Sequence, residues 1–382
     1  MERFGSRALL LDVSRGQVHG VAALRDAVDR MAALGYNSLL LYLEAHAVRW
    51  RSHPHLADGY PALSLDDLRA LDEHAVARGV ALIPALQTLG HWERALRTPG
   101  YEHLAYDADR PWSLRPCPEA WSLLDDLVGD LASACHGPLV HAGLDEPFDL
   151  LGIQECTHVV ASGYVSGQAL AHHVGVDAYL AHALAVHRIL TAHGRRMAMW
   201  DDVALHWPAL LPALPRDVVL VDWPSGYRAM EDYPGLDVAA SAGHEVWACA
   251  GTHAWHERVG PTTVRAHVAA TVHAAERRRL PGFVLAHWDD AGTAMLDDAF
   301  WALARYSALA RHDAPDRLAC RDDRDRLFGA LRSVYALARK RTEEINGRQD
   351  LTDEQREALH AEKAWYVPMD ALDALMAQAG DG

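Results

Sequence analysis

The segment His141-Ala142-Gly143-Leu144-Asp145-Glu146 places two neighbouring carboxylic acids directly after a short apolar run. Two close carboxylates in a partly dry cleft push their pKa values apart, so that one stays ionised and the other can act as a general acid. Hydrolysis of a glycosidic bond is the commonest use of such a pair. Adjacent acids are too close together to flank a sugar ring as acid and nucleophile. The attacking oxygen would therefore come from elsewhere, and a 2-acetamido group on the substrate is the known alternative.

Both acids can enter one pocket only where the strand pleat breaks, because neighbouring side chains of a regular strand point to opposite faces. Pro147 cannot continue a strand ladder, and it favours an extended or turn conformation at Glu146. An isolated Asp-Glu pair is more often a simple turn cap. The upstream His141 and the small Ala142-Gly143 pair, which permits close packing, favour a functional site here.

Apolar segments of strand length alternate eight times with amphipathic segments of helix length. The predicted strands are 8–15, 36–44, 80–89, 139–146, 196–202, 218–223, 245–251 and 282–290. The predicted helices include 21–35, 64–79, 119–137, 177–194 and 262–280, with C-cap glycines at Gly35, Gly79 and Gly194. Strands without alternation are buried on both faces, which is typical of a parallel sheet covered by helices. The pattern predicts an α/β fold, a (β/α)₈ TIM barrel.

A doubly wound open sheet is the main alternative, but it would more often carry a Gly-rich phosphate loop after its first strand, and DVSRGQVHG is not GxGxxG. Polar or aromatic residues instead gather at the carboxyl end of nearly every predicted strand, where a barrel has its active site. These residues are Asp12, Arg15, Glu44, Gln87, His91, Asp145, Glu146, Trp200, Asp202, Asp222, Trp223, Trp288 and Asp290. Their recurrence supports a closed barrel.

The barrel is predicted to occupy residues 1–311, and residues 312–382 are predicted to form a helical extension that packs on it or makes a homodimer contact. The chain has 382 residues and a net charge of −16, which repels phosphate backbones and anionic membranes. We expect no nucleic acid or membrane partner. The N-terminal apolar stretch is too short for a signal peptide, and no run approaches the ~18 apolar residues of a membrane span, so a cytoplasmic location is expected.

The five cysteines are scattered and include no CxxC pair, which argues against a disulfide framework or a zinc cluster. Histidines at 172, 173, 182 and 187 lie in an alanine-rich helical segment without an HExxH pattern, and we expect them at the surface. No metal site is therefore expected, and the family resemblance described next also implies that no organic cofactor is needed.

The HxGxDE segment resembles the signature of glycoside hydrolase family 20, the retaining exo-β-N-acetylhexosaminidases. Five further segments resemble the family in the expected order over residues 8–292. LLLDVSR carries Arg15, LLLYLE and LIPALQTLGH carry Glu44 and His91 and are similar to a subgroup without the extra N-terminal domain, MAMWDD carries Trp200 and Asp202, and LAHWDDAG carries Trp288 and Asp290.

The resemblance implies that the substrate attacks its own anomeric carbon through the acetamido oxygen and forms an oxazolinium intermediate. Asp145 would orient the acetamido group, Glu146 would serve as general acid and base, and Tyr227 would hold the acetamido carbonyl, with Tyr233 as second choice. The expected substrate-binding residues are Arg15, Glu44, His91, His141, Trp200, Asp202, Trp223, Trp255, Trp288 and Asp290. Trp112, Trp121 and Trp301 lie away from strand ends and are expected to fill the core.

The partner implied is a small molecule or oligosaccharide with a terminal 2-acetamido sugar. The loop AHAVRWRSHPHLADGY departs from the family pattern, as does THAWHERVG, so the choice between β-linked GlcNAc and GalNAc stays open. Three alternatives remain: a GalNAc-selective relative with the same mechanism, a barrel that binds amino sugars without cleaving them, and a metal-dependent hydrolase.

Overall fold

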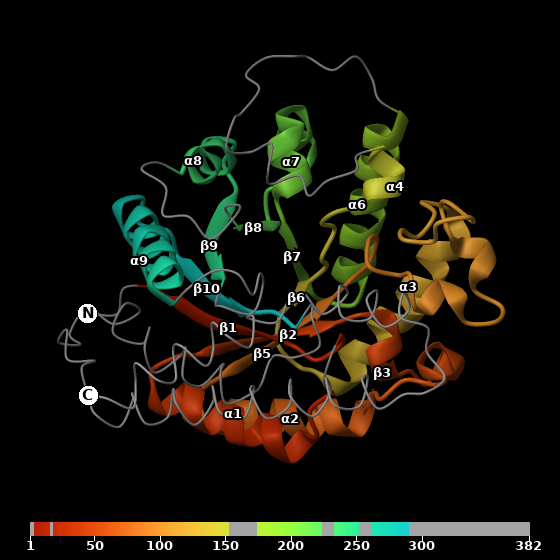
Figure 1. Ribbon diagram of the computed structural model, residues 1–382, viewed down its shortest axis with the longest axis horizontal. Helices are drawn as coiled ribbons and strands as arrows, with labels where there is room; N and C mark the ends of the chain where they lie inside the picture. The colour runs from red at the N-terminus through yellow and green to blue at the C-terminus, as the bar shows by residue number, and fades with distance from the viewer. Residues whose placement is uncertain (1–3, 16–17, 153–173, 224–232, 252–260, 290–382) are drawn as a thin grey trace, which may run out of the picture.

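The chain folds into a closed barrel of eight parallel strands, ordered β1-β10-β9-β8-β7-β6-β5-β2, and helices surround the strands (Figure 1). The computed structural model describes residues 4–15, 18–152, 174–223, 233–251 and 261–289. This architecture confirms the predicted (β/α)₈ barrel. It closes because β1, the first strand, pairs in parallel both with its neighbour β2 and with β10, the last strand.

The eight barrel strands lie within or close to the predicted apolar segments. They are β1 (Ser6–Asp12), β2 (Ser38–Leu43), β5 (Ala81–Leu86), β6 (Leu139–His141), β7 (Arg196–Trp200), β8 (Val219–Asp222), β9 (Glu245–Gly251) and β10 (Gly282–His287). A short parallel pair, β3 (Val48–Arg49) and β4 (Leu63–Ser64), lies in the loop after β2 and was not predicted.

Five of the helices follow the predicted segments: α1 (Val21–Ala33), α2 (Leu65–Ala77), α3 (Pro118–Ala134), α6 (Val174–Ala192) and α9 (Pro261–Arg277). Three further helices were not predicted: α4 (Phe148–Leu151), α7 (Asp202–His206) and α8 (Pro234–Ser241). Ser64 and Asp67 form a capping box at the start of α2. Gly35, Gly79 and Gly194 all have positive φ, as expected for residues that end helices.

Two layers of apolar side chains form the core, and strand alternation assigns each side chain to one of them. Leu9, Leu39 and Leu41 pack outward under the helices, whereas Leu10 and Leu40 face the barrel interior. Interior side chains come from alternate positions of each strand, as a barrel requires. The last interior position of several strands is polar or aromatic rather than aliphatic: Tyr42, Trp200, Trp223 and Trp288. Because side chains alternate along each strand, these four all face the barrel interior at its carboxyl end, which is called the mouth below.

Helix α6 corrects one expectation about the histidines. His182 is fully buried, its Nε2 lies 2.8 Å from the Thr88 main-chain oxygen, and its Nδ1 accepts a hydrogen bond from Trp121. The expected surface position of His182 is therefore wrong, because α6 packs against α3 and turns this side chain inward. His187 lies 3.0 Å from Asp217 at the protein surface. His172 and His173 lie outside the described residues.

The predicted C-terminal extension, residues 312–382, lies outside the described residues, as does the end of the predicted barrel domain after residue 289. Within the described part of the chain, none of the helices has the length and apolar character needed to cross a bilayer. Cys117, Cys135 and Cys249, the cysteines in that part, are free thiols.

Candidate active site

The acid pair lies on an irregular segment that follows β6. The strand ends at His141, four residues before Asp145, so the predicted strand 139–146 was too long. Gly143, Leu144 and Glu146 have φ values of 67°, 72° and 50°, which end the pleat. Glu146 thus adopts a turn rather than an extended conformation before Pro147. Positive φ in a non-glycine residue costs on the order of 1–3 kcal/mol, so the surrounding structure must hold this segment in place.

Hydrogen bonds from three elements hold the strained segment. The Trp112 indole donates to the Glu146 main-chain oxygen at 2.7 Å, and the Tyr179 hydroxyl of α6 donates to that of Leu144 at 3.1 Å. An Asp202 carboxylate oxygen accepts the Glu146 amide proton at 3.3 Å. Trp112 was expected in the core; instead it contacts the segment 142–147 that carries Asp145 and Glu146, called the acid loop below. Its ring lies 4.7 Å from the His91 ring, tilted by 57°. No strand-end signal marks Trp112, which lies in the loop between β5 and α3.

Two glycines let neighbouring loops approach the acids. A Cβ on Gly143 would lie 1.9 Å from Oε1 of Gln87, and one on Gly90 would lie 2.7 Å from the Asp145 main-chain oxygen. The absence of a side chain at Gly143 allows Gln87 to reach Asp145, where its Nε2 donates to Oδ1 at 2.9 Å. The glycine of the HxGxDE motif is therefore needed both for its backbone angle and for space.

His91 supplies positive charge to both acids. Its Nε2 lies 3.5 Å from Asp145 Oδ2 and 3.6 Å from Glu146 Oε2. Burial opposes the charged imidazolium, but Asp145 and then Glu146 outweigh it and raise the pKa of His91 to about 9. Burial likewise raises the pKa of Asp145, yet His91 and the Gln87 hydrogen bond bring it below its usual value. At neutral pH the pair therefore contains an ionised Asp145 beside a protonated His91.

The same three residues have the composition of a possible metal site. One donor atom from each of His91, Asp145 and Glu146 lies within 4.8 Å of the others. A metal ion would have to displace the proton from His91, whose pKa is raised by the two acids, because a histidine ligand must be neutral.

A second cluster forms around Arg15, just after β1. Its Nε lies 3.1 Å from Glu44 Oε1, and its Nη2 donates to the Tyr42 hydroxyl at 2.7 Å. The guanidinium also lies 4.8 Å from the centre of the Tyr42 ring and 5.3 Å from that of Trp288. Tyr42 was absent from the predicted site, although it precedes the expected Glu44 by two residues and so has the same interior parity. Glu44 and Tyr42 thus hold the Arg15 side chain in one orientation at the barrel mouth.

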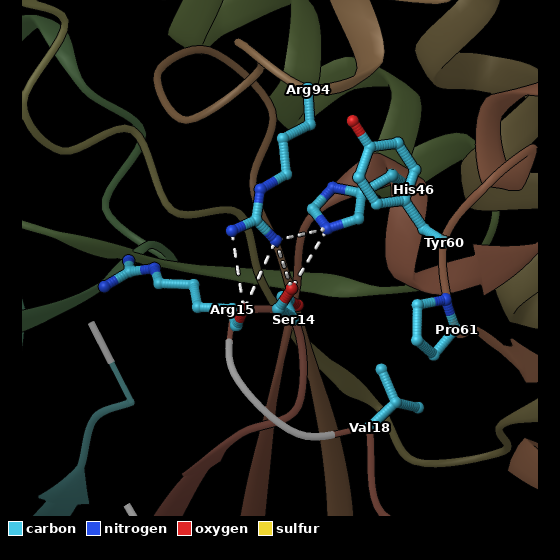
Figure 2. Close-up of a pocket in the computed structure, with 7 residues that line it drawn as sticks. All are labelled: Ser14, Arg15, Val18, His46, Tyr60, Pro61 and Arg94. Atoms are coloured by element: carbon cyan, nitrogen blue, oxygen red, sulfur yellow. Dashed lines mark hydrogen bonds between the residues drawn. The ribbon is translucent and has the colours of Figure 1, made fainter. Parts of the chain in front are cut away.

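Arg94 and His46 contact the main chain of the segment after β1, which carries Arg15. Arg94 Nη1 donates to the Ser14 main-chain oxygen at 2.9 Å, and it lies 3.1 Å from His46 Nε2 (Figure 2). Burial lowers the pKa of His46 to about 4, so its ring is neutral at neutral pH. His46 Nε2 also lies 3.0 Å from the Ser14 main-chain oxygen, and its Nδ1 lies 3.5 Å from Glu44 Oε2. Sequence reasoning did not identify either residue.

Aromatic rings line the interior at the mouth. Trp200 lies 6.1 Å from Trp223 and 5.8 Å from Trp288, measured between ring centres. His141 is buried 4.5 Å from the Trp200 ring, and its Nδ1 accepts the Gly143 amide proton at 3.1 Å. Burial lowers the pKa of His141 to about 4, so a neutral ring supports the acid loop from below.

Beyond Trp200, three carboxylic acids gather in the same region. Asp201, Asp202 and Asp222 are all buried. Burial, followed by the charges of Asp222 and Asp202, raises the pKa of Asp201 well above its usual value. Burial also raises the pKa of Asp222 to about 7, against the opposing charge of Arg278. Only Asp202 of this group contacts the acid loop directly through a described hydrogen bond.

The structure brings most of the predicted site residues to one end of the barrel. Asp145, Glu146 and His91 form one cluster, Arg15 and Glu44 form a second, and the remaining described members contribute the ring wall and its support. Tyr227, Trp255 and Asp290 lie outside the described residues. Tyr233, the second choice for the acetamido contact, instead packs in the outer core and accepts a hydrogen bond from Thr271 of α9.

The described end of the barrel thus combines the acid pair Asp145 and Glu146, an Arg15 that is paired with Glu44, and tryptophan rings. Residues 4–276 match the model of "Glycosyl hydrolase family 20, catalytic domain", and the chain belongs to this family. The curated "Beta-hexosaminidase 1" of Coccidioides posadasii (strain RMSCC 757 / Silveira) is 23% identical over 277 residues, which are 65% of this chain and 45% of that relative.

Two solved structures have a similar fold. A Flavobacterium johnsoniae chitobiase is 17% identical with a TM-score of 0.63, and the match covers 86% of this chain and 51% of that one. A Streptomyces plicatus N-acetyl-beta-hexosaminidase, solved in complex with Thio-NAglucal, is 18% identical with a TM-score of 0.61, over 84% of this chain and 66% of that one. The chain thus spans about half to two thirds of the length of these proteins.

Replacing Gly143 by Ala should reduce turnover of p-nitrophenyl N-acetyl-β-glucosaminide, the substrate class implied by the sequence, by roughly 10²-fold. The added methyl displaces Gln87 and so removes a hydrogen bond that orients Asp145. Gly194→Ala is the matched control, because Gly194 has φ 69° but open space around its Cβ position. Equal activity of the two variants would contradict the steric role of Gly143.

The raised pKa of His91 predicts a pH-dependent stability. Because the folded protein binds this proton more tightly than the unfolded chain, the stabilisation is complete below pH 6.5 and disappears as pH rises through about 9. The contribution is at most a few kcal/mol. Thermal unfolding between pH 6 and 9.5, repeated with His91→Gln, measures it. A variant whose melting temperature falls as steeply as the parent's over this range would refute the assignment.

Proposed function

We propose that the protein is a retaining exo-β-N-acetylhexosaminidase that removes terminal β-linked GlcNAc or GalNAc by substrate-assisted catalysis. The observation that carries the proposal is the placement of the Asp145 and Glu146 oxygens beside one His91 nitrogen, within 4.8 Å of each other. Both acids thus occupy one wall of the site. Membership of family 20 supports the same chemistry.

The shared wall determines which group can attack the sugar. A retaining enzyme with a carboxylate nucleophile places its two acids on opposite sides of the scissile bond, about 5–5.5 Å apart. Oxygens of Asp145 and Glu146 instead lie within 4.8 Å of each other beside the same His91 nitrogen, so the two acids share one wall rather than facing each other. The acetamido oxygen of the substrate is then the nucleophile. Holding it near the anomeric carbon can lower the barrier by about 7–11 kcal/mol through proximity.

Each acid has a separate task in this mechanism. Asp145, kept ionised by His91 and held by Gln87, accepts the acetamido N–H and stabilises the positive charge that develops on the oxazolinium ring. Glu146 protonates the leaving oxygen, and it then removes a proton from the water that opens the ring. The attack and its reversal occur on opposite faces of the anomeric carbon, so the configuration is retained.

The rest of the mouth binds the sugar. Arg15, paired with Glu44, is suited to donate hydrogen bonds to ring hydroxyls at the end remote from the acids. Trp200 and Trp288 provide apolar surface for the C–H face of the ring, and both indole N–H groups lack a hydrogen-bond partner among the described residues.

The GalNAc-selective alternative shares every group described above, so turnover of matched GlcNAc and GalNAc aryl glycosides decides between the two. A barrel that only binds sugars would not need a general acid such as Glu146, which here contacts His91 and lies in a loop bound by Trp112.

The cytoplasmic location, the absence of nucleic acid and membrane partners, and a homodimer through the C-terminal extension remain predictions.

The acid pair can be tested by substitution. Glu146→Gln removes the proton donor and should reduce kcat by about 10²–10⁴-fold. The loss should be smaller for aryl glycosides with acidic leaving groups, which need less protonation. Asp145→Asn should reduce kcat for all leaving groups, because it weakens the acetamido nucleophile. Full activity of the Asp145 variant would rule out substrate assistance.

A panel of aryl β-glycosides with and without the 2-acetamido group tests the nucleophile directly. The protein should hydrolyse the 2-acetamido substrates and leave the plain glucoside and galactoside essentially untouched, since only the former carry the attacking oxygen. A parallel series with EDTA addresses the metal-dependent alternative, and activity should persist. Comparable hydrolysis of the plain glycosides would exclude the proposed mechanism, and loss of activity with EDTA would favour a metal site at His91, Asp145 and Glu146.

A further inference from the structure

Helix α6 directs two side chains toward the two loops that form the acid site. Tyr179 and His182 are three residues apart on one face of the helix, and both are fully buried. Tyr179 donates to the Leu144 main-chain oxygen of the acid loop, and His182 Nε2 lies 2.8 Å from the main-chain oxygen of Thr88, in the loop after β5. We propose that His182 is a positioning residue, which holds the loop after β5 in the geometry that its side chains need to orient Asp145.

The two partners of His182 fix its tautomer and its orientation. A main-chain oxygen can only accept a hydrogen bond, so Nε2 must carry the ring proton that is donated to Thr88. The Trp121 indole of α3 can only donate, and its N–H lies 3.2 Å from Nδ1, which must therefore be unprotonated. Burial lowers the pKa of His182 to about 4, so the ring is neutral at neutral pH, as this arrangement requires. Turning the ring over would break both hydrogen bonds.

Thr88 joins the loop after β5 to the acid loop. Its hydroxyl donates to the main-chain oxygen of Ala142, the first residue of the acid loop, at 2.7 Å, and its amide donates to the same oxygen at 3.2 Å. Thr88 and Ala142 are both buried. A chain of hydrogen bonds thus runs from α3 through His182 and Thr88 to the start of the acid loop. The bond from His182 acts at the point where the two loops meet.

This point lies next to the groups that hold Asp145. Gln87, directly before Thr88, donates from Nε2 to Asp145 Oδ1 at 2.9 Å. His91, three residues after Thr88, has its Nε2 3.5 Å from Asp145 Oδ2. The φ of His91 is 60°, so local preference does not stabilise this loop, and contacts from outside must hold it. His182 supplies such a contact, although it has no contact with Asp145 itself.

The consequence for catalysis rests on the proposed function. If Asp145 orients the acetamido group, a shift of the loop after β5 moves Asp145 away from the position that the nucleophile needs. A displacement of about 1 Å can cost on the order of 10²-fold in rate. The contacts of Arg15 with Glu44 and Tyr42 involve neither Thr88 nor its loop. Loss of the His182 bond should therefore weaken stabilisation of the oxazolinium intermediate more than it weakens substrate binding.

Two substitutions that differ only in reach test the proposal. Asn at position 182 is too short to reach Thr88, although its oxygen can still accept from Trp121, whereas the amide nitrogen of Gln can take the place of Nε2. His182→Asn should lower kcat for p-nitrophenyl N-acetyl-β-glucosaminide by about 10–100-fold, and His182→Gln should recover kcat to within about fivefold of the parent. His187→Asn is the matched control, because it makes the same change on the same helix at a residue that is paired with Asp217.

An inhibition constant separates positioning from loss of folded protein, because it does not depend on the fraction of active enzyme. A thiazoline analogue of the oxazolinium intermediate should inhibit His182→Asn at least about tenfold more weakly than the parent. If that variant does not fold, Trp121→Phe provides the same measurement. It removes only the bond to Nδ1 and should weaken inhibition by about threefold.

Three results would overturn the role of His182 while the parent remains active. They are an unchanged kcat in a folded His182→Asn, equal losses in the Asn and Gln variants, and parent-like inhibition by the thiazoline in the variant measured. Each of them leaves the proposed function intact. A parent protein that does not hydrolyse the 2-acetamido substrate would instead refute the proposed function, and the catalytic role of His182 would fall with it.

Discussion

The site depends on a positive charge that lets two neighbouring carboxylates share a buried wall. Like charges at this separation repel strongly where water is excluded, and a buried acid without a partner would take up a proton. His91 meets this requirement because its Nε2 approaches an oxygen of each acid, and its own pKa rises to about 9 in return. The charges of Asp145 and His91 thus stabilise each other, so neither protonation state would persist without the other.

The backbone around the two acids is strained. Leu144, Glu146 and His91 all have positive φ, and together they make up three of the four such non-glycine residues in the described chain. Their concentration around the acids indicates that the fold tolerates strain where the side chains must converge. Tyr179, Trp112 and Asp202 offset part of it through hydrogen bonds from three different parts of the barrel. The acid loop is therefore fixed by tertiary contacts and not by local preference.

The described mouth has two polar centres with different roles. One is the acid cluster between β5 and β7, and the other is the Arg15 cluster at the ends of β1 and β2. In the second, Arg94 and a neutral His46 bind main-chain oxygens and leave the Arg15 side chain to Glu44 and Tyr42. On the proposed function, a sugar between the two centres would react at the acid cluster and be bound at the Arg15 cluster.

The sequence by itself determined the barrel, because uninterrupted apolar strands and intervening amphipathic helices have few other ways to bury both faces of a sheet. It also indicated which strand ends carry polar groups, since the alternation of interior positions is a local property of each strand. The early end of β6, the role of Gly143 in admitting Gln87, and the placement of Trp112 against the acid loop were decided only by the tertiary structure. Each of these depends on atoms from loops far apart in the chain meeting at a few ångströms, and no spacing within one segment encodes such a distance.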